Sequence, residues 1–393
     1  MDETTFRRLL RDVADSQRGP SPELPAAVLR RGRRRLIRIA AVAVLAASVL
    51  AGGVVAGVEA VQGVDRPIPD NIPTPHGPRS LPGTIAFAGR SSREGPPQVF
   101  LAHPDGTITQ ITHGPEASVA VAWSPDGSDL LMYGQSGTFV ARSDGTPVAF
   151  LTHRVNREYG PAHWSPDGTK IAFQAGQTLY VVNADGTEKR TLASDVFTKM
   201  LPEHLDFSWS PDGTRIAYSG APNGDPPAIY VVNVDGSGLV RLTDPSVMPA
   251  GHPAWSPDGS TIAFAAAWAT PGCKNADGCV YLMRPDGTGL RRLRPGQSPI
   301  WSPDGSKIAF LDADGQVVVM DADRTNPTPI PGSSWYGMSW SPDGTKLVYI
   351  SLSIRGAGGD VEIVNADGSG LILVTRNQGA AQSFLPLWRP SGG

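Results

Sequence analysis

Short apolar runs that alternate with turn-forming strings fill the chain from about residue 83 onward. Lys170-Ile-Ala-Phe173 and Leu179-Tyr-Val-Val182 are typical, and a turn string stands on each side of such a run. Runs of this length, rich in β-branched and aromatic residues and bounded by Gly, Pro, Asn and Asp, predict strands rather than helices. The pattern therefore predicts an all-β domain built from short strands.

A tryptophan followed by a tight-turn string marks each repeat of this pattern. Trp-Ser-Pro-Asp-Gly begins at Trp123, Trp164, Trp209, Trp255, Trp301 and Trp340, and a degraded Trp-Arg-Pro-Ser-Gly begins at Trp388. The copies recur every 39 to 48 residues, which suits a propeller blade of four strands, A to D. Proline presets the first turn position, Asp bonds to its own backbone and Gly accepts the left-handed conformation. The Asp of each string is therefore predicted to be structural, in a turn that joins strands A and B.

A second turn, between strands C and D, recurs in forms such as Asn183-Ala-Asp-Gly and is degraded to Asp321-Ala-Asp-Arg in the sixth unit. Seven B strands can be counted, but the first, Thr84-Ile-Ala-Phe, has no Trp string before it, and Trp388 has no B strand after it. Both deficits disappear if the segment ending at Trp388 supplies strand A of the first blade. We therefore expect residues 83–393 to form a seven-bladed β-propeller closed by its C-terminal strand, which removes the exposed edges of an open sheet.

A single hydrophobic segment precedes the repeats. The twenty residues from Ile39 to Val58 carry no charge, which is enough for a helix to cross a bilayer, and we expect a transmembrane helix over residues 39–61. The arginine-rich stretch before it, Arg30 to Arg38, predicts that residues 1–38 are cytoplasmic and the propeller extracytoplasmic. The alternative, a cleaved signal peptide, would need an unusually long basic region and apolar core.

Three further features belong to this N-terminal part. Residues 62–82 are rich in proline and predict a semi-rigid stalk. The small residues Gly53 and Gly57 have the spacing that lets two transmembrane helices approach, so a homodimer is one hypothesis and chance in an Ala- and Gly-rich span is the other. Phe6, Leu9, Leu10 and Val13 stand at helical spacing and allow a short amphipathic cytoplasmic helix.

The Trp-Ser-Pro-Asp-Gly, Lys-Ile-Ala-Phe and Asn-Ala-Asp-Gly strings resemble the repeats of the TolB-like, WD-like propeller family of bacterial periplasmic and surface proteins. The resemblance runs from about Gly83 to the end of the chain. It implies a propeller fold. TolB itself carries an additional α/β domain before six blades, whereas seven units are counted here, so the fold is transferred and the partner is not. Related repeats occur in prolyl oligopeptidase-type peptidases, whose hydrolase domain needs a Gly-x-Ser-x-Gly motif that this chain lacks, and in oligogalacturonate lyases, which place a His-rich metal site on the propeller.

Charge narrows the choice of partner. Of the net charge of −3, residues 1–38 contribute +5, so the remainder is acidic. Phosphate backbones require a clustered basic surface, and nucleic acid is therefore not expected as a partner.

Four histidines precede successive tryptophans and could in principle gather at one face: His113, His153, His204 and His252. They stand 10, 11, 5 and 3 residues before the next Trp, whereas ligands of one metal on a ring should occupy similar depths. We therefore predict no metal site and no cofactor.

The connections from D to A and from B to C emerge on one face of a propeller, here called the top face. The residues there that suit a peptide, sugar or cationic ligand are Glu158, Tyr159, Glu203, His204, His252, Trp335 and Tyr336. Blade packing is the competing role for the aromatic members. The two cysteines, Cys273 and Cys279, are separated by a turn string and are predicted to form a disulfide, because an outside location permits one.

These observations lead to a membrane-anchored propeller that binds a protein, a peptide or a cell-wall glycan, with no convergent catalytic set in view. Two alternatives stay open: a carbohydrate lyase acting on the top face, and a transmembrane sensor coupled to a cytoplasmic factor through the N-terminal helix.

Overall fold

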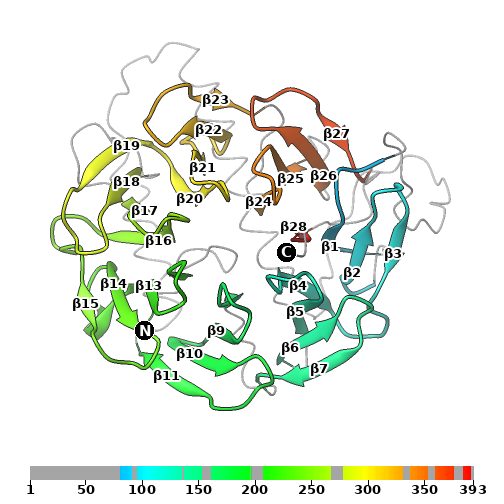
Figure 1. Cartoon of the computed structure of the whole chain (residues 1–393), viewed down its shortest axis with the longest axis horizontal. Helices are drawn as coiled ribbons and strands as arrows, with labels where there is room; N and C mark the ends of the chain where they lie inside the picture. The colour runs from blue at the N-terminus through cyan, green and yellow to red at the C-terminus, as the bar shows by residue number, and fades with distance from the viewer. Residues whose placement is uncertain are drawn as a thin grey trace, which may run out of the picture. The chain divides into compact units, whose positions relative to one another are not determined.

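Seven four-stranded antiparallel sheets form a ring in the computed structural model of this chain (Figure 1). The structure describes residues 80–390 except 91–94, 135–136, 153–160, 195, 197–206, 267–277, 331–336, 353–358 and 376–383. The chain divides into two units, Met1–Ile68 and Pro69–Gly393, and all described residues lie in the second. The prediction of an all-β, seven-bladed propeller is confirmed.

Each blade runs from strand A nearest the centre to strand D at the rim. The blades are, in this order of strands, blade 1 with β28 (Phe384–Trp388), β1 (Ile85–Gly89), β2 (Gln98–Ala102) and β3 (Ile108–Gln110); blade 2 with β4 (Ser118–Trp123), β5 (Asp129–Gly134), β6 (Gly137–Arg142) and β7 (Pro147–Phe150); blade 3 with β8 (Ala162–Trp164), β9 (Lys170–Ala175), β10 (Thr178–Asn183) and β11 (Arg190–Ala193); and blade 4 with β12 (Phe207–Trp209), β13 (Arg215–Gly220), β14 (Ala228–Asn233) and β15 (Val240–Arg241).

The other three blades follow the same plan. They are blade 5 with β16 (Ala250–Trp255), β17 (Ile262–Ala266), β18 (Cys279–Met283) and β19 (Arg291–Pro295); blade 6 with β20 (Gln297–Trp301), β21 (Lys307–Leu311), β22 (Val317–Asp321) and β23 (Thr328–Pro329); and blade 7 with β24 (Met338–Trp340), β25 (Lys346–Leu352), β26 (Gly359–Asn365) and β27 (Ile372–Leu373). Within the described residues the one helical element is a single 3-10 turn, η1 (Pro222–Gly224).

The C-terminal strand closes the ring as the repeat count predicted. β28 pairs antiparallel with β1, with Trp388 opposite Ile85, so the last strand of the chain is strand A of the first blade. Leu81, within the predicted stalk, is already buried, and its N–H donates to Pro104 O at 2.7 Å. Both ends of the propeller are thus fastened within blade 1.

The hydrophobic core lies between the blades rather than within any one of them. Seven clusters of buried side chains each join two neighbouring sheets, one cluster for each interface around the ring. The cluster between blades 1 and 2, for example, joins Val99 and Leu101 to Trp123 and Met132. Because a sheet has two apolar faces here, every blade needs both neighbours, and burial of this kind is the main source of stability.

Indole N–H groups tie strand A of one blade to strand A of the blade before it. Trp209 Nε1 donates to His163 O at 3.2 Å and Trp301 Nε1 to Ala254 O at 3.1 Å. Trp123 and Trp340 make the same contact at 3.4 Å, with Leu387 O and Ile300 O. In each case the acceptor is the residue just before the preceding blade's Trp, so the repeat spacing itself sets the bond.

The Ser-Pro-Asp-Gly turns confirm that their aspartates are structural. In blade 4, Ser210 Oγ donates to Asp212 Oδ1 at 2.5 Å and accepts a hydrogen bond from Arg215 N, while Asp212 Oδ1 accepts one from Thr214 N. These hydrogen bonds, the one from Ser210 first, hold the pKa of Asp212 below its usual value. The aspartate thus organises the turn that joins strands A and B.

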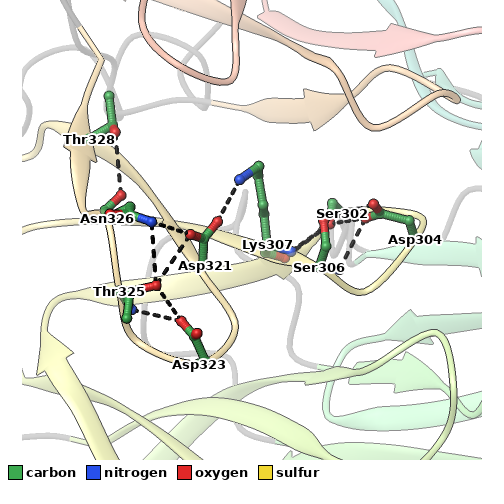
Figure 2. Close-up of polar contacts among 9 residues, drawn as sticks. All are labelled: Ser302, Asp304, Ser306, Lys307, Asp321, Asp323, Thr325, Asn326 and Thr328. Carbon is green, nitrogen blue, oxygen red and sulfur yellow. Dashed lines mark hydrogen bonds and ion pairs between the residues drawn. The ribbon is translucent and has the colours of Figure 1, made fainter.

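Blade 6 replaces the usual glycine of its second turn with Arg324, which has φ +79°; the six glycines at this place in the other blades have φ between +80° and +87°. Additional polar contacts surround this turn (Figure 2). Asp321 accepts hydrogen bonds from Asn326 Nδ2 at 2.7 Å and from Thr325 Oγ1 at 3.3 Å, and it pairs with Lys307 Nζ at 2.5 Å. The substitution keeps the left-handed backbone. Asn183 and Asn365 make the corresponding lysine contacts in the glycine turns of blades 3 and 7, so blade 6 differs in the charge of Asp321 and in its bond with Asn326.

Within the described residues, no helix is both long and apolar enough to cross a membrane. The predicted cytoplasmic segment 1–38, the predicted transmembrane helix 39–61 with Gly53 and Gly57, and the stalk up to residue 79 lie outside those residues.

Candidate functional site at the inner strands

The A strands of blades 5 and 6, β16 and β20, both contain an extra residue where they pair with strand B. Pairing of β16 with β17 shifts register between Gly251 and Ala254, and pairing of β20 with β21 shifts between Gln297 and Ile300. Irregularities of this kind re-aim side chains and are frequent next to functional sites. The same one-residue shift occurs where β28 pairs with β1 and where β4 pairs with β5. Four inner strands therefore share the irregularity, and two of them belong to the neighbouring blades 5 and 6 (Figure 1).

Two non-glycine residues adopt a left-handed backbone conformation at the irregularities of blades 5 and 6. His252 has φ +55° and Ser298 has φ +52°, and each stands three residues before the Trp of its blade. A proline follows each of them; an inner edge strand tolerates proline because it needs no N–H donor on its free side. Non-glycine residues in this region cost on the order of 1 kcal/mol or more and cluster at binding and catalytic sites.

Packing from the neighbouring blade holds the backbone around His252. Ser219, fully buried in β13, donates through Oγ to Ala250 O at 3.2 Å. A Cβ added to Gly251 would lie 3.5 Å from that same Oγ, so the two blades are in close contact just before His252. The His252 side chain itself is only 7% exposed. An imidazole and a hydroxyl, both able to donate and accept hydrogen bonds, thus occupy equivalent positions of adjacent inner strands.

Of the seven predicted ligand-binding residues, the structure describes one, His252. Glu158, Tyr159, Glu203, His204, Trp335 and Tyr336 lie outside the described residues, as do the D to A connections that contain them. Whether these residues converge stays a prediction. The sequence reasoning missed Ser298, although its Ser-Pro-Ile-Trp string matches the His-Pro-Ala-Trp string at His252 and was the available signal.

The histidines considered as metal ligands do not form a described cluster. His113 is exposed after β3 and His252 is buried in β16, while His153 and His204 fall outside the described ranges. Among the residues that the structure describes, no three His, Cys, Asp or Glu side chains are grouped so that they could hold a metal ion.

Cys279 opens β18 and is fully buried and disulfide-bonded. Its predicted partner, Cys273, lies outside the described residues. The pairing of the two therefore stays a prediction for the connection between β17 and β18.

A further histidine, His163 in β8, was not singled out from the sequence. Its Nε2 atom is buried and has no hydrogen-bond partner among the described residues, although the residue as a whole keeps some exposed surface. Its ring meets Phe207 of the next blade edge-on at 5.2 Å. Burial lowers the pKa of His163 to about 4, so the ring is neutral at pH 7 and serves the interface between blades 3 and 4.

Comparisons with known proteins agree on the fold. The TolB from Acinetobacter baumannii is similar over 80% of this chain and 68% of its own, with 19% identity and a TM-score of 0.50. An oligogalacturonate lyase from Vibrio parahaemolyticus is similar over 75% of this chain and 87% of its own, with 14% identity and a TM-score of 0.55. At these identities the likeness concerns the fold alone.

A puromycin-hydrolyzing peptidase from Mycobacterium tuberculosis is similar over 77% of this chain, with 15% identity and a TM-score of 0.56. The chain spans about half of that peptidase, 54% of its length. No curated protein matches the sequence.

The solved structures agree only on the fold, whereas the family comparison names a particular propeller domain. Residues 202–392 match the model of the TolB beta propeller domain, PD40. That range covers the last four blades together with the closing strand of the first. The repeats quoted above and this match agree, and both support the TolB-like propeller family for this chain.

Proposed function

We propose that this protein is a membrane-anchored, extracytoplasmic propeller that binds a protein, a peptide or a cell-wall glycan on its top face. The observation that carries the proposal is the pair of strained residues, His252 and Ser298, at equivalent positions of adjacent inner strands. The repeated residues serve mainly the fold, since the aspartates organise turns and four of the seven repeat tryptophans bond to the preceding blade. Specific recognition is therefore left to the irregular part of the A strands and to the connections that precede them.

The family match supports a binding role because a TolB-like propeller can act as a binding module. The net charge of −8 outside residues 1–38, from −3 for the whole chain and +5 for that segment, favours a neutral or cationic ligand over nucleic acid. The arginines before residue 39 support the proposed orientation in the membrane.

Site-specific photo-crosslinking on the full-length protein in cells tests the face used for binding. A photoreactive residue replaces Gln297, at the top end of β20, or Ser260, in a turn at the opposite end of blade 5. We expect defined adducts from position 297 only, and we expect the additional substitution His252→Asn to weaken them. Equal adducts from both positions, or adducts unaffected by His252→Asn, would contradict the proposed face.

Accessibility of the same two positions to a membrane-impermeant reagent, after Gln297→Cys or Ser260→Cys in a Cys273→Ser, Cys279→Ser background, tests the location separately. Labelling in intact cells supports an extracytoplasmic propeller. Labelling that requires lysis would place the propeller inside and end that part of the proposal.

The lyase alternative is favoured by one observation, the buried histidine at the inner strands of a fold shared with oligogalacturonate lyase. It predicts formation of unsaturated products from oligogalacturonate, and loss of that activity in His252→Asn. The sensor alternative predicts that a cytoplasmic protein is labelled by a proximity enzyme fused ahead of residue 1.

A further inference from the structure

One charged residue interrupts a regular aromatic arrangement in strand C of the blades. At the position three residues before the first residue of the turn between strands C and D, five blades carry an aromatic ring: Phe100, Phe139, Tyr180, Tyr230 and Tyr281. Four of these rings stack on an aromatic partner directly across in strand B, with ring centres 5.4 to 5.7 Å apart. Blade 7 places Glu362 there, opposite Tyr349.

The carboxylate of Glu362 is only partly satisfied by its surroundings. The Tyr349 hydroxyl donates a hydrogen bond to it, and burial together with this negative charge raises the pKa of Tyr349 above its usual value. Oε2 of Glu362 is buried and has no hydrogen-bond partner among the described residues. Tyr349 and Val364, which share the face of Glu362 in the sheet, pack against blade 6. An acid thus faces the boundary between blades 6 and 7, where the other blades hold rings or, in blade 6, Val318.

Three other blades provide a cation beside the same position. Lys189 Nζ lies 4.2 Å from the centre of the Tyr180 ring and 5.1 Å from that of Phe173. In strand D, Arg241 pairs opposite Tyr230 and Arg292 opposite Tyr281. Blade 7 has Leu373 opposite Glu362, and two positions earlier stands Leu371, which is 54% exposed. In blade 7, an acid with two leucines beside it therefore occupies these positions, and the described strand D supplies no cation.

We propose that Glu362, with Tyr349 behind it and Leu371 and Leu373 beside it, is a subsite for a lysine or arginine side chain of a protein partner. The aliphatic stem of such a side chain packs on the two leucines while its charged end approaches the carboxylate of the half-buried Glu362. The contact would place a cation from outside at the position beside which blades 3, 4 and 5 supply one from the chain. This subsite lies between blades 6 and 7 and is independent of binding at His252.

The test uses the full-length protein in detergent, with methyl-labelled leucine observed by NMR. The probe is N-acetyl-lysine methylamide, and its uncharged isostere, N-acetyl-norleucine methylamide, is the control ligand. We expect the lysine probe to shift the methyl signals of Leu371 and Leu373 saturably, and the norleucine probe to do so at least about tenfold more weakly, because it lacks the charged hydrogen bond.

Three variants separate the subsite from general charge attraction. Glu362→Gln keeps the shape and removes the charge, and Glu362→Phe restores the aromatic pair of the other blades; both should bind the lysine probe about tenfold more weakly or not at all. Asp314→Asn removes one exposed charge from the turn between β21 and β22 and should leave binding unchanged.

Equal responses to the two probes, or equal losses in Asp314→Asn and Glu362→Gln, would overturn the proposal. A parent protein that does not respond to the lysine probe would overturn it as well. If Glu362→Gln then also melts well below the parent, Glu362 pairs with a cation of the chain itself. The Glu362→Phe variant checks that any loss of binding occurs in a folded propeller.

Discussion

The guanidinium carbon of Arg389 lies 5.3 Å from the centre of the Trp123 ring, and Arg389 Nε donates to Gly127 O at 2.8 Å. Arg389 follows the closing strand β28, whereas Trp123 and Gly127 belong to strand A and the first turn of blade 2. The Arg389 side chain thus fastens the C-terminal end of the propeller, whose last strand completes blade 1, to blade 2.

Replacing Arg389 by Ala should lower the free energy of unfolding by about 1–2 kcal/mol, the sum of an exposed cation–π contact and a charged hydrogen bond. Chemical denaturation of the purified protein measures this. Arg389→Lys should recover part of the loss, since the ammonium keeps the charge over the ring without the planar fork. An unchanged midpoint in Arg389→Ala would mean that closure does not depend on this contact.

Deleting residues 384–393 should abolish cooperative unfolding of the propeller. The deletion removes β28, the pairing with β1 and the buried ring of Trp388, and it leaves an open edge on blade 1. Circular dichroism during heating is the measurement, with Trp388→Phe as a milder control that should keep the transition. A truncated protein that melts like the parent would disprove closure by this strand.

Two tryptophans of neighbouring blades provide a matched test of the indole hydrogen bonds. Trp209 Nε1 donates to His163 O, whereas Trp164 Nε1 is buried and has no hydrogen-bond partner in the part of the chain that the structure describes. Trp209→Phe should therefore cost about 1 kcal/mol more than Trp164→Phe, because it also leaves a carbonyl unsatisfied. Unfolding free energies of the two variants decide the matter, and equal losses would show that the indoles act through burial alone.

The pH dependence of stability should reveal His163. Its folded pKa of about 4 is below the ordinary value of 6.5, so the unfolded chain binds the extra proton first. The stabilising contribution is complete above pH 6.5 and declines as pH falls toward 4, by an amount on the order of 3 kcal/mol. His163→Phe should flatten the stability curve between these two pH values.

The exposed His113 gives the control for that experiment. His113→Asn should leave the slope between pH 6.5 and 4 as it is in the parent. If stability still declines between pH 6.5 and 4 in His163→Phe, the decline belongs to another titratable group. Acid destabilisation below about pH 4 should persist in both variants, because the pKa of turn aspartates such as Asp212 is held down in the fold and their contribution is lost only as pH falls through it.

Arg324→Gly should stabilise the propeller by about 0.5–1 kcal/mol. The change removes the cost of a left-handed conformation for a residue with a side chain, which stabilises the folded protein. The larger backbone entropy of glycine in the unfolded chain offsets part of this gain. Arg324→Asn should fall between the two, since Asn tolerates this conformation better than Arg. A destabilised Arg324→Gly, measured by denaturation, would mean that the arginine side chain itself contributes to the blade 6 turn.

The sequence by itself determined the blade count, the closing strand and the structural role of the turn aspartates. These follow from local chemistry: a proline, an aspartate and a glycine make the same turn wherever they occur in this order, and a fixed spacing from Trp to Trp counts the blades. Arg324 shows how far the rule extends, because the turn of blade 6 keeps its backbone even where the glycine is replaced.

Only the tertiary structure decided which residues meet across blades. The backbone before His252 is held by Ser219, and the ring of His163 meets Phe207, in each case from a neighbouring sheet. The unpartnered oxygen of Glu362 is likewise known only from the folded arrangement. Glu362 resembles any polar residue in the sequence and becomes distinctive only when the strands are aligned and its partner Tyr349 is known. Repetition makes the fold readable from one chain, while burial between blades, which joins residues far apart in the sequence, decides where the exceptions lie.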